Sequence, residues 1–83
     1  MRIGQKVQYL HNLPKEFRHF VEESSGVISG TNSFRGKVSL VVRYNIKKNV
    51  IVKRGLKNIK EQWHKFGTHI YLTRDISSFK LRG

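Results

Sequence analysis

The middle of this 83-residue chain is basic and free of acids. Between Ser24 and Lys60 there are nine lysines and arginines and no acidic residue, whereas three of the five acids of the chain lie within residues 16–23. Lysine and arginine bind phosphate oxygens, and a surface that neutralises several phosphates binds a nucleic-acid backbone. General solubility does not require such an uneven distribution. The pattern therefore predicts a surface that contacts a polyanion.

Most of these cations fall on two expected strands and the turn between them. If Val38, Leu40 and Val42 face the core, the alternate residues of the same strand project from the opposite face. We expect one continuous basic face, with these residues on phosphate: Lys37, Arg43, Lys47, Lys48, Lys53, Arg54 and Lys57.

Two aromatic residues are candidates for stacking on nucleic-acid bases. Phe34 lies beside Arg35 in the glycine-bounded, polar segment 30–36. Phe34 either stacks on a base, with Arg35 on phosphate, or folds back as an anchor on the core. Tyr71 alternates with apolar Ile70 and Leu72, which predicts an exposed stacking platform on the other strand face.

A hydrolytic function would draw on a different set of residues, namely His64, His69, Tyr71 and Arg74. Small basic endoribonucleases of the toxin type need little more than such groups around a scissile phosphate. The sequence leaves open whether the two histidines converge. We assign no catalytic residue, metal ligand or cofactor, because the chain has no cysteine and its carboxylates are few and scattered.

The elements that must position these groups are mostly strands. The chain has no alanine and is rich in valine and isoleucine, a composition that favours β structure. Period-two alternation predicts strands at 3–10, 37–44 and 68–73, and short apolar runs predict further strands at 26–29 and 50–52, with a last short strand at 77–82. A loop is expected at 30–36 and a hairpin connection at 45–49.

Helical spacing is expected in two places. A short helix or loop insertion is predicted near residues 12–24, where Phe17, Phe20 and Val21 form a short stripe after Pro14. Leu56, Ile59, Trp63 and Phe66 predict a second helix near 56–66, ended by Gly67. We expect Trp63 to lie in the core. The whole chain, 1–83, is predicted to be a single mainly β domain of four to six strands, a small curved antiparallel sheet or barrel.

Several stretches of the chain resemble SH3-like small barrels, the group that includes KOW and Tudor-type modules. The residues that carry the likeness are 3–7, 26–28, 37–44, 49–53 and 56–59, and 34–38 is similar to part of a KOW motif. The likeness covers roughly residues 1–60, segment 11–25 is an insertion, and the further glycine of a KOW motif does not follow Gly36. The resemblance implies binding of RNA, DNA, a ribosome or RNA polymerase.

The composition limits the functions that this chain can have. A net charge of +12 favours a polyanionic partner. No apolar run approaches the length of a membrane span. With no apolar leader, a cytoplasmic location is expected. We predict a non-enzymatic nucleic-acid-binding accessory protein, for DNA or RNA, in transcription, translation or the nucleoid, or as a phage or plasmid accessory protein. The alternatives are the endoribonuclease and a regulator docking on an acidic protein surface, as a monomer or homodimer.

Overall fold

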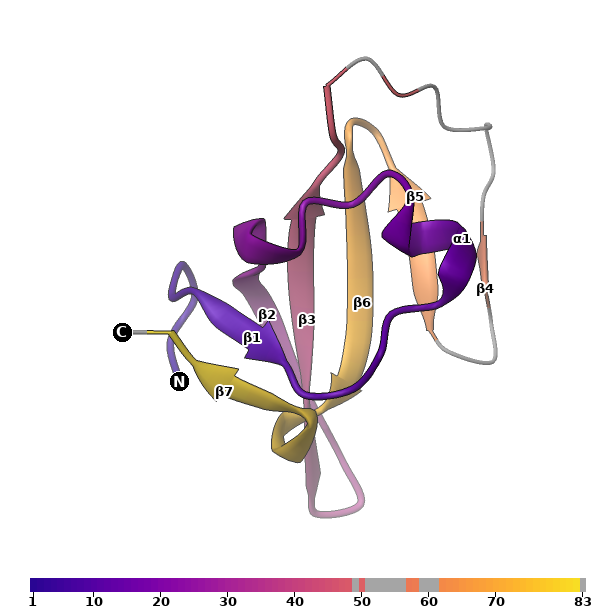
Figure 1. Cartoon of the computed structure of the whole chain (residues 1–83). Coiled ribbons are helices and arrows are strands. Elements are labelled where there is room, and N and C mark those ends of the chain that lie inside the picture. The colour runs from indigo at the N-terminus through magenta and orange to yellow at the C-terminus, as the bar shows by residue number, and fades with distance from the viewer. Residues whose placement is uncertain (49, 51–56, 59–61, 83) are drawn as a thin grey trace.

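The computed structural model describes residues 1–48, 50, 57–58 and 62–82 (Figure 1). Its elements run in the order β1 (Val7–Tyr9), α1 (Lys15–Arg18), η1 (Glu23–Ser25), β2 (Val27–Phe34), β3 (Lys37–Asn45), β4 (Lys57–Asn58), β5 (Trp63–Phe66), β6 (His69–Asp75), η2 (Ile76–Ser78) and β7 (Phe79–Leu81). The prediction of a mainly β chain is confirmed.

The strands form two antiparallel sheets. One has five strands in the order β2-β3-β6-β5-β4, and the other pairs β1 with β7. A bridge between Lys6 and Val27 joins the sheets at one corner, where the Gly4 N–H donates to the carbonyl of Ile28 over 2.8 Å. Among the described strands β2 and β4 end the larger sheet without pairing to each other, so no closed barrel is seen.

One face of the five-stranded sheet carries the core. Leu40, Val42 and Tyr44 alternate along β3, and Ile70 and Leu72 along β6, all at most 1% exposed. The smaller sheet and α1 lie in front of this inner face in Figure 1. Phe17 of α1 stacks on Trp63 of β5 with ring centroids 5.0 Å apart. The prediction that Trp63 is a core residue is confirmed, although it lies on a strand.

The predicted loop over residues 30–36 is wrong. Strand β2 continues to Phe34, and only Arg35 and Gly36 form the turn to β3. Both turn residues have positive φ, 51° and 75°, which a two-residue hairpin turn between twisted strands requires. A polar composition is typical of loops, which is why the sequence predicts one here. These residues are polar because this half of the hairpin extends beyond the core, where both strand faces meet water.

The predicted helix near 56–66 is also wrong. The described part of this segment is β4 and β5, and the apolar spacing is coincidental because Trp63 points to the core while Phe66 is 72% exposed. Gly67, expected as a helix cap, has φ 62° and begins the two-residue turn from β5 to β6. Aromatic residues favour strands, and the edge of β6 supplies the backbone partners.

The other elements are shorter than predicted or differently paired. The insertion near 12–24 contains only the single turn of α1 and the turn η1, and the first strand is reduced to Val7–Tyr9. Strand β3 pairs with β2 and β6 on its two sides, whereas the sequence predicts 50–52 as its hairpin partner. Residues 49, 51 and 52 lie outside the described chain. No helix in the described part is long and apolar enough to cross a membrane.

Candidate nucleic-acid interface

The outer face of the five-stranded sheet carries polar and aromatic side chains in place of the core residues. Cross-strand register places Arg43 of β3 opposite Tyr71 of β6, and Tyr71 opposite His64 of β5. His64 is in turn opposite Lys57 of β4. Residues directly opposite one another in antiparallel strands share a face and interact. One rung of the sheet therefore brings Arg43, Tyr71 and His64 side by side.

Four rings gather around this rung, and we call His64, Phe66, His69 and Tyr71 the Tyr71 cluster. The His64 ring stacks on Tyr71 with centroids 5.5 Å apart and planes 14° from parallel. Phe66 and His69 meet Tyr71 edge-on at 6.4 and 6.5 Å. Phe66 is 72% exposed, and the other three rings are half-buried. The cluster therefore presents aromatic surface to solvent from a rigid sheet.

The local sequence explains why the rings meet. Residues 63–66 and 69–75 both alternate, so Trp63, Ile70 and Leu72 turn inward while the cluster turns outward. The tight turn at Gly67 and Thr68 then fixes the register, with Phe66 opposite His69. A shift by one residue would place every ring on the wrong face.

Cations lie beside the cluster. Arg43 is exposed on the central rung. At the end of the sheet, Lys47 and Lys65 line a shallow depression of about 340 Å³ beside Gly67 and Thr68, next to Phe66 in the chain. An acid shares the outer face at the opposite end, where Asp75 pairs with Ser39. The register places Lys65 opposite buried Ile70, on the inner face, so Arg43 is the cation that lies directly beside the rings on the central rung.

The β2–β3 turn forms a second basic and aromatic group, which we call the hairpin tip: Phe34, Arg35 and Lys37. Phe34 is 72% exposed, so it is not the core anchor that the sequence left open, and the guanidinium carbon of Arg35 lies 5.2 Å from its ring centroid. Lys37 and Arg43 are six positions apart along β3, a span of roughly 20 Å. Figure 1 shows the turn from β2 to β3 and the turn from β5 to β6 at opposite ends of the sheet.

The ten residues predicted from sequence thus divide into groups. Arg43, Lys47 and Tyr71 belong to the Tyr71 cluster end, and Phe34, Arg35 and Lys37 to the hairpin tip. Lys48 is exposed just beyond β3, and Lys57 lies opposite His64 in register. Lys53 and Arg54 fall outside the described residues. The described neighbours of β3 are β2 and β6, so the basic face expected on 37–44 continues onto β6 on one side, and residues 51 and 52 lie outside the described chain.

The sequence does not identify Phe66 as a site residue, because its spacing from Trp63 matches a helical stripe. Gly67 directly after Phe66 is the one local signal for a turn between two strands.

The histidines proposed for hydrolysis do converge. His64 and His69 both contact the Tyr71 ring, from neighbouring strands. Arg74 belongs to the alternate set of β6, opposite buried Leu40, and so does not join them on the outer face. No group of three or more potential metal ligands is found among the described residues. The acid–base groups that the fold brings together on this face are these two imidazoles, on either side of the Tyr71 ring.

The rings, the cations and the two histidines determine what the outer face can bind. The core on the other face of the sheet fixes the strands that carry these side chains. No protein-family model matches the chain, and neither the curated proteins nor the solved structures give a significant match.

Proposed function

We propose that this protein binds single-stranded nucleic acid across the outer face of its five-stranded sheet. The observation that carries the proposal is the Tyr71 cluster, four rings packed on one another with Phe66 72% exposed at their margin. Aromatic rings on a sheet provide stacking platforms for successive bases, and stacking tolerates any base sequence. The rings of the cluster are not part of the core, because the core residues of β5 and β6 are the alternate residues, which point to the other face of the sheet.

Electrostatics supports the same face. Arg43 flanks Tyr71 on the central rung, and Lys47 lies at the end of the sheet near Gly67 and Thr68, close to Phe66 in the fold. A strand whose bases stack on Phe66 and Tyr71 would carry its phosphates past these cations. With a net charge of +12, attraction at long range adds to each contact.

The rings favour a single strand over a duplex. Bases in a duplex are already stacked and paired, so they offer only their edges, whereas an unpaired base exposes a face to an aromatic side chain. A sheet surface with outward rings matches unpaired bases. DNA and RNA share this chemistry, and the proposal covers both.

The test is fluorescence anisotropy of labelled single-stranded and duplex oligonucleotides of the same length, between low and moderate salt. We expect tighter binding to the single strand and an affinity that falls steeply as salt rises. Tyr71→Ala should weaken single-strand binding. Thr73→Ala changes a half-buried residue two positions along the same strand face and serves as the matched control. Equal affinity for both nucleic acids, or a Tyr71→Ala protein that binds normally, would contradict the proposal.

The endoribonuclease remains a second candidate because one observation favours it, the convergence of His64 and His69 on Tyr71. In such a reaction one imidazole would take the proton of a ribose 2′-hydroxyl as it attacks phosphorus. The other would protonate the departing 5′-oxygen, leaving a 2′,3′-cyclic phosphate. Cleavage of RNA but not DNA in the binding reactions, lost in both His64→Ala and His69→Ala, would establish it. Intact RNA after long incubation would leave binding alone.

The likeness to SH3-like small barrels also stays a proposal. The bridge from Lys6 to Val27 supports it, since it brings the β1–β7 pair against β2 as a continuation of the larger sheet. An accessory role in transcription, translation or the nucleoid follows from single-strand binding. A regulator that docks on an acidic protein would use the same cations but leave Phe66 and Tyr71 without a role.

A further inference from the structure

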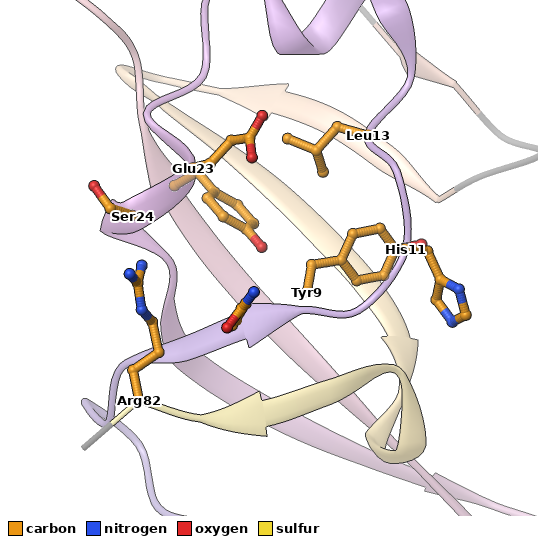
Figure 2. Close-up of a pocket in the computed structure, with 8 residues that line it drawn as sticks. Tyr9, His11, Leu13, Glu23, Ser24 and Arg82 are labelled. Carbon is orange, nitrogen blue, oxygen red and sulfur yellow. The ribbon is translucent and has the colours of Figure 1, made fainter.

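A polar cavity of about 210 Å³ lies on the inner side of the molecule, away from the Tyr71 cluster. Its lining comes from segments far apart in sequence, including Tyr9 of β1, His11 after it, Glu23 of η1, Tyr44 of β3 and Arg82 after β7. Figure 2 shows Arg82 at one side of the cavity and Tyr9 and His11 at the other. The cavity therefore places a cation, a carboxylate and aromatic rings around one small volume.

The hydroxyl group of Tyr44 is the most telling feature of the lining. Tyr44 is only 1% exposed, and its hydroxyl is buried without a hydrogen-bond partner among the described residues. Buried hydroxyl groups almost always have a partner, either protein or water, so an unpaired one in a cavity lining leaves a hydrogen bond for a polar group that enters the cavity. Burial raises the pKa of Tyr44, and Tyr9 and Glu23 raise it further. The hydroxyl stays protonated and can donate a hydrogen bond.

The two charged residues of the lining are held by the backbone. Glu23 begins η1, where the Ser25 N–H donates to the Glu22 carbonyl over 3.0 Å and the Ser25 hydroxyl accepts from the Asn45 N–H over 2.9 Å. The Arg82 N–H donates to the Lys6 carbonyl over 3.0 Å. Both side chains thus start from fixed positions at the cavity.

We propose that this cavity binds a nucleotide whose base carries an exocyclic amino group. The amino group donates to the Glu23 carboxylate, the Tyr44 hydroxyl bonds the adjacent ring position, and the phosphate meets Arg82. The Tyr9 ring forms an apolar wall for the base. An anionic ligand is favoured over a zwitterion or a cation because the chain carries a net charge of +12.

The carboxylate sets the expected specificity. An ionised carboxylate only accepts hydrogen bonds, and adenine, cytosine and guanine each bring an amino donor. Uracil brings carbonyl oxygens at the corresponding positions, which would face the carboxylate without a proton between them. A site built on a hydrogen bond rejects an analogue that lacks the partner more strongly than an apolar pocket does.

The test is isothermal titration calorimetry of the full chain with the 5′-monophosphates of adenosine, cytidine, guanosine and uridine. We expect the nucleotides with an exocyclic amino group to bind at least about tenfold more tightly than uridine monophosphate. A tenfold difference in affinity lies within the discrimination that one bidentate contact provides. Glu23→Gln should abolish that preference, and Tyr44→Phe, which keeps the ring and its packing, should weaken binding of all four. Glu22→Gln, one residue away and outside the lining, is the matched control and should bind as the parent does.

The test of this cavity can be distinguished from the test of the proposed single-strand site. Phe66→Ala should leave mononucleotide binding unchanged, whether or not it weakens strand binding. A 5′-phosphorylated oligonucleotide that displaces the mononucleotide from the Phe66→Ala protein would identify a strand end as the ligand, and failure to displace it would identify the free nucleotide. Equal affinity for all four nucleotides, no binding of any, or a Glu23→Gln protein with the parental preference would overturn the inference. Thermal melting of each variant shows that it is folded.

Discussion

Two phenylalanines at opposite ends of the same sheet are equally exposed, at 72%, but their surroundings differ. Phe66 meets Tyr71 edge-on within a cluster of four rings. Among the described residues, no other ring packs on Phe34, and its contact is with the guanidinium of Arg35, its neighbour in the chain. Exposure alone would rank the two as equal candidates for stacking. The comparison shows that the support around an exposed ring separates the two sites.

The difference extends to the layer beneath. Under the Tyr71 cluster the same strands bury Trp63, Ile70 and Leu72, so the rings are fixed by a packed core. At the hairpin tip both faces of the strands are exposed from Thr31 to Val38. A ring on a supported strand loses less conformational entropy on binding a base than a ring on a projecting turn. We therefore place base stacking at Phe66 and Tyr71, and only accessory phosphate contacts at the tip.

The largest effect is expected beneath the cluster. Trp63→Ala removes a 1% exposed ring that packs on Phe17 and Tyr44, and should lower the free energy of unfolding by about 3–5 kcal/mol. For a domain of this size, that loss leaves little or no folded protein. Denaturant unfolding or thermal melting gives the measurement. A stable Trp63→Ala protein would show that the core does not support the cluster.

The next effect concerns the two exposed rings themselves. Phe66→Ala should weaken single-strand binding by about 1–3 kcal/mol, the value of a stacked base, with little change in stability. Phe34→Ala removes an equally exposed ring and should change binding by much less. Anisotropy titrations of the two variants side by side make the comparison. The reverse order of effects would move the stacking site to the hairpin tip.

The cations at the two ends of the sheet should also differ in how strongly they affect nucleic-acid binding. Replacing Arg43 and Lys47 with glutamine should reduce the slope of log affinity against log salt by about 1.4 for a single strand, because two phosphate contacts are lost. Replacing Arg35 and Lys37 removes the same charge at the other end and should reduce the slope by less. The measurement is binding at four or more salt concentrations. Equal reductions would mean that net charge, and not position, governs binding.

The smallest effect is expected at the turn. Arg35→Asn places a residue that tolerates positive φ where φ is 51°, but it also removes the contact with Phe34. These contributions oppose each other, so the free energy of unfolding should change by less than about 1 kcal/mol. Denaturant unfolding of this variant beside Trp63→Ala measures the contrast. A loss as large as that of Trp63→Ala would show that the tip is structurally essential.

The sequence predicted the β class, the alternation of β3 and β6, and the outward position of Tyr71, because period-two patterning reports which strand face is buried. It did not reveal the partners of those strands. The helical spacing from Leu56 to Phe66 matched a stripe by chance, and that error hid Phe66. The convergence of His64, His69 and Tyr71 depends on strand pairing across a turn, which no local pattern contains.

The most direct test of the single-strand site is an amide chemical-shift map of the ¹⁵N-labelled protein during titration with a short single-stranded oligonucleotide. We predict the largest shifts along the outer rung and the β5–β6 turn, at His64, Phe66, Tyr71 and Arg43, with weaker changes at the hairpin tip. Shifts concentrated at Phe34, Arg35 and Lys37, with the Tyr71 cluster unmoved, would contradict the account.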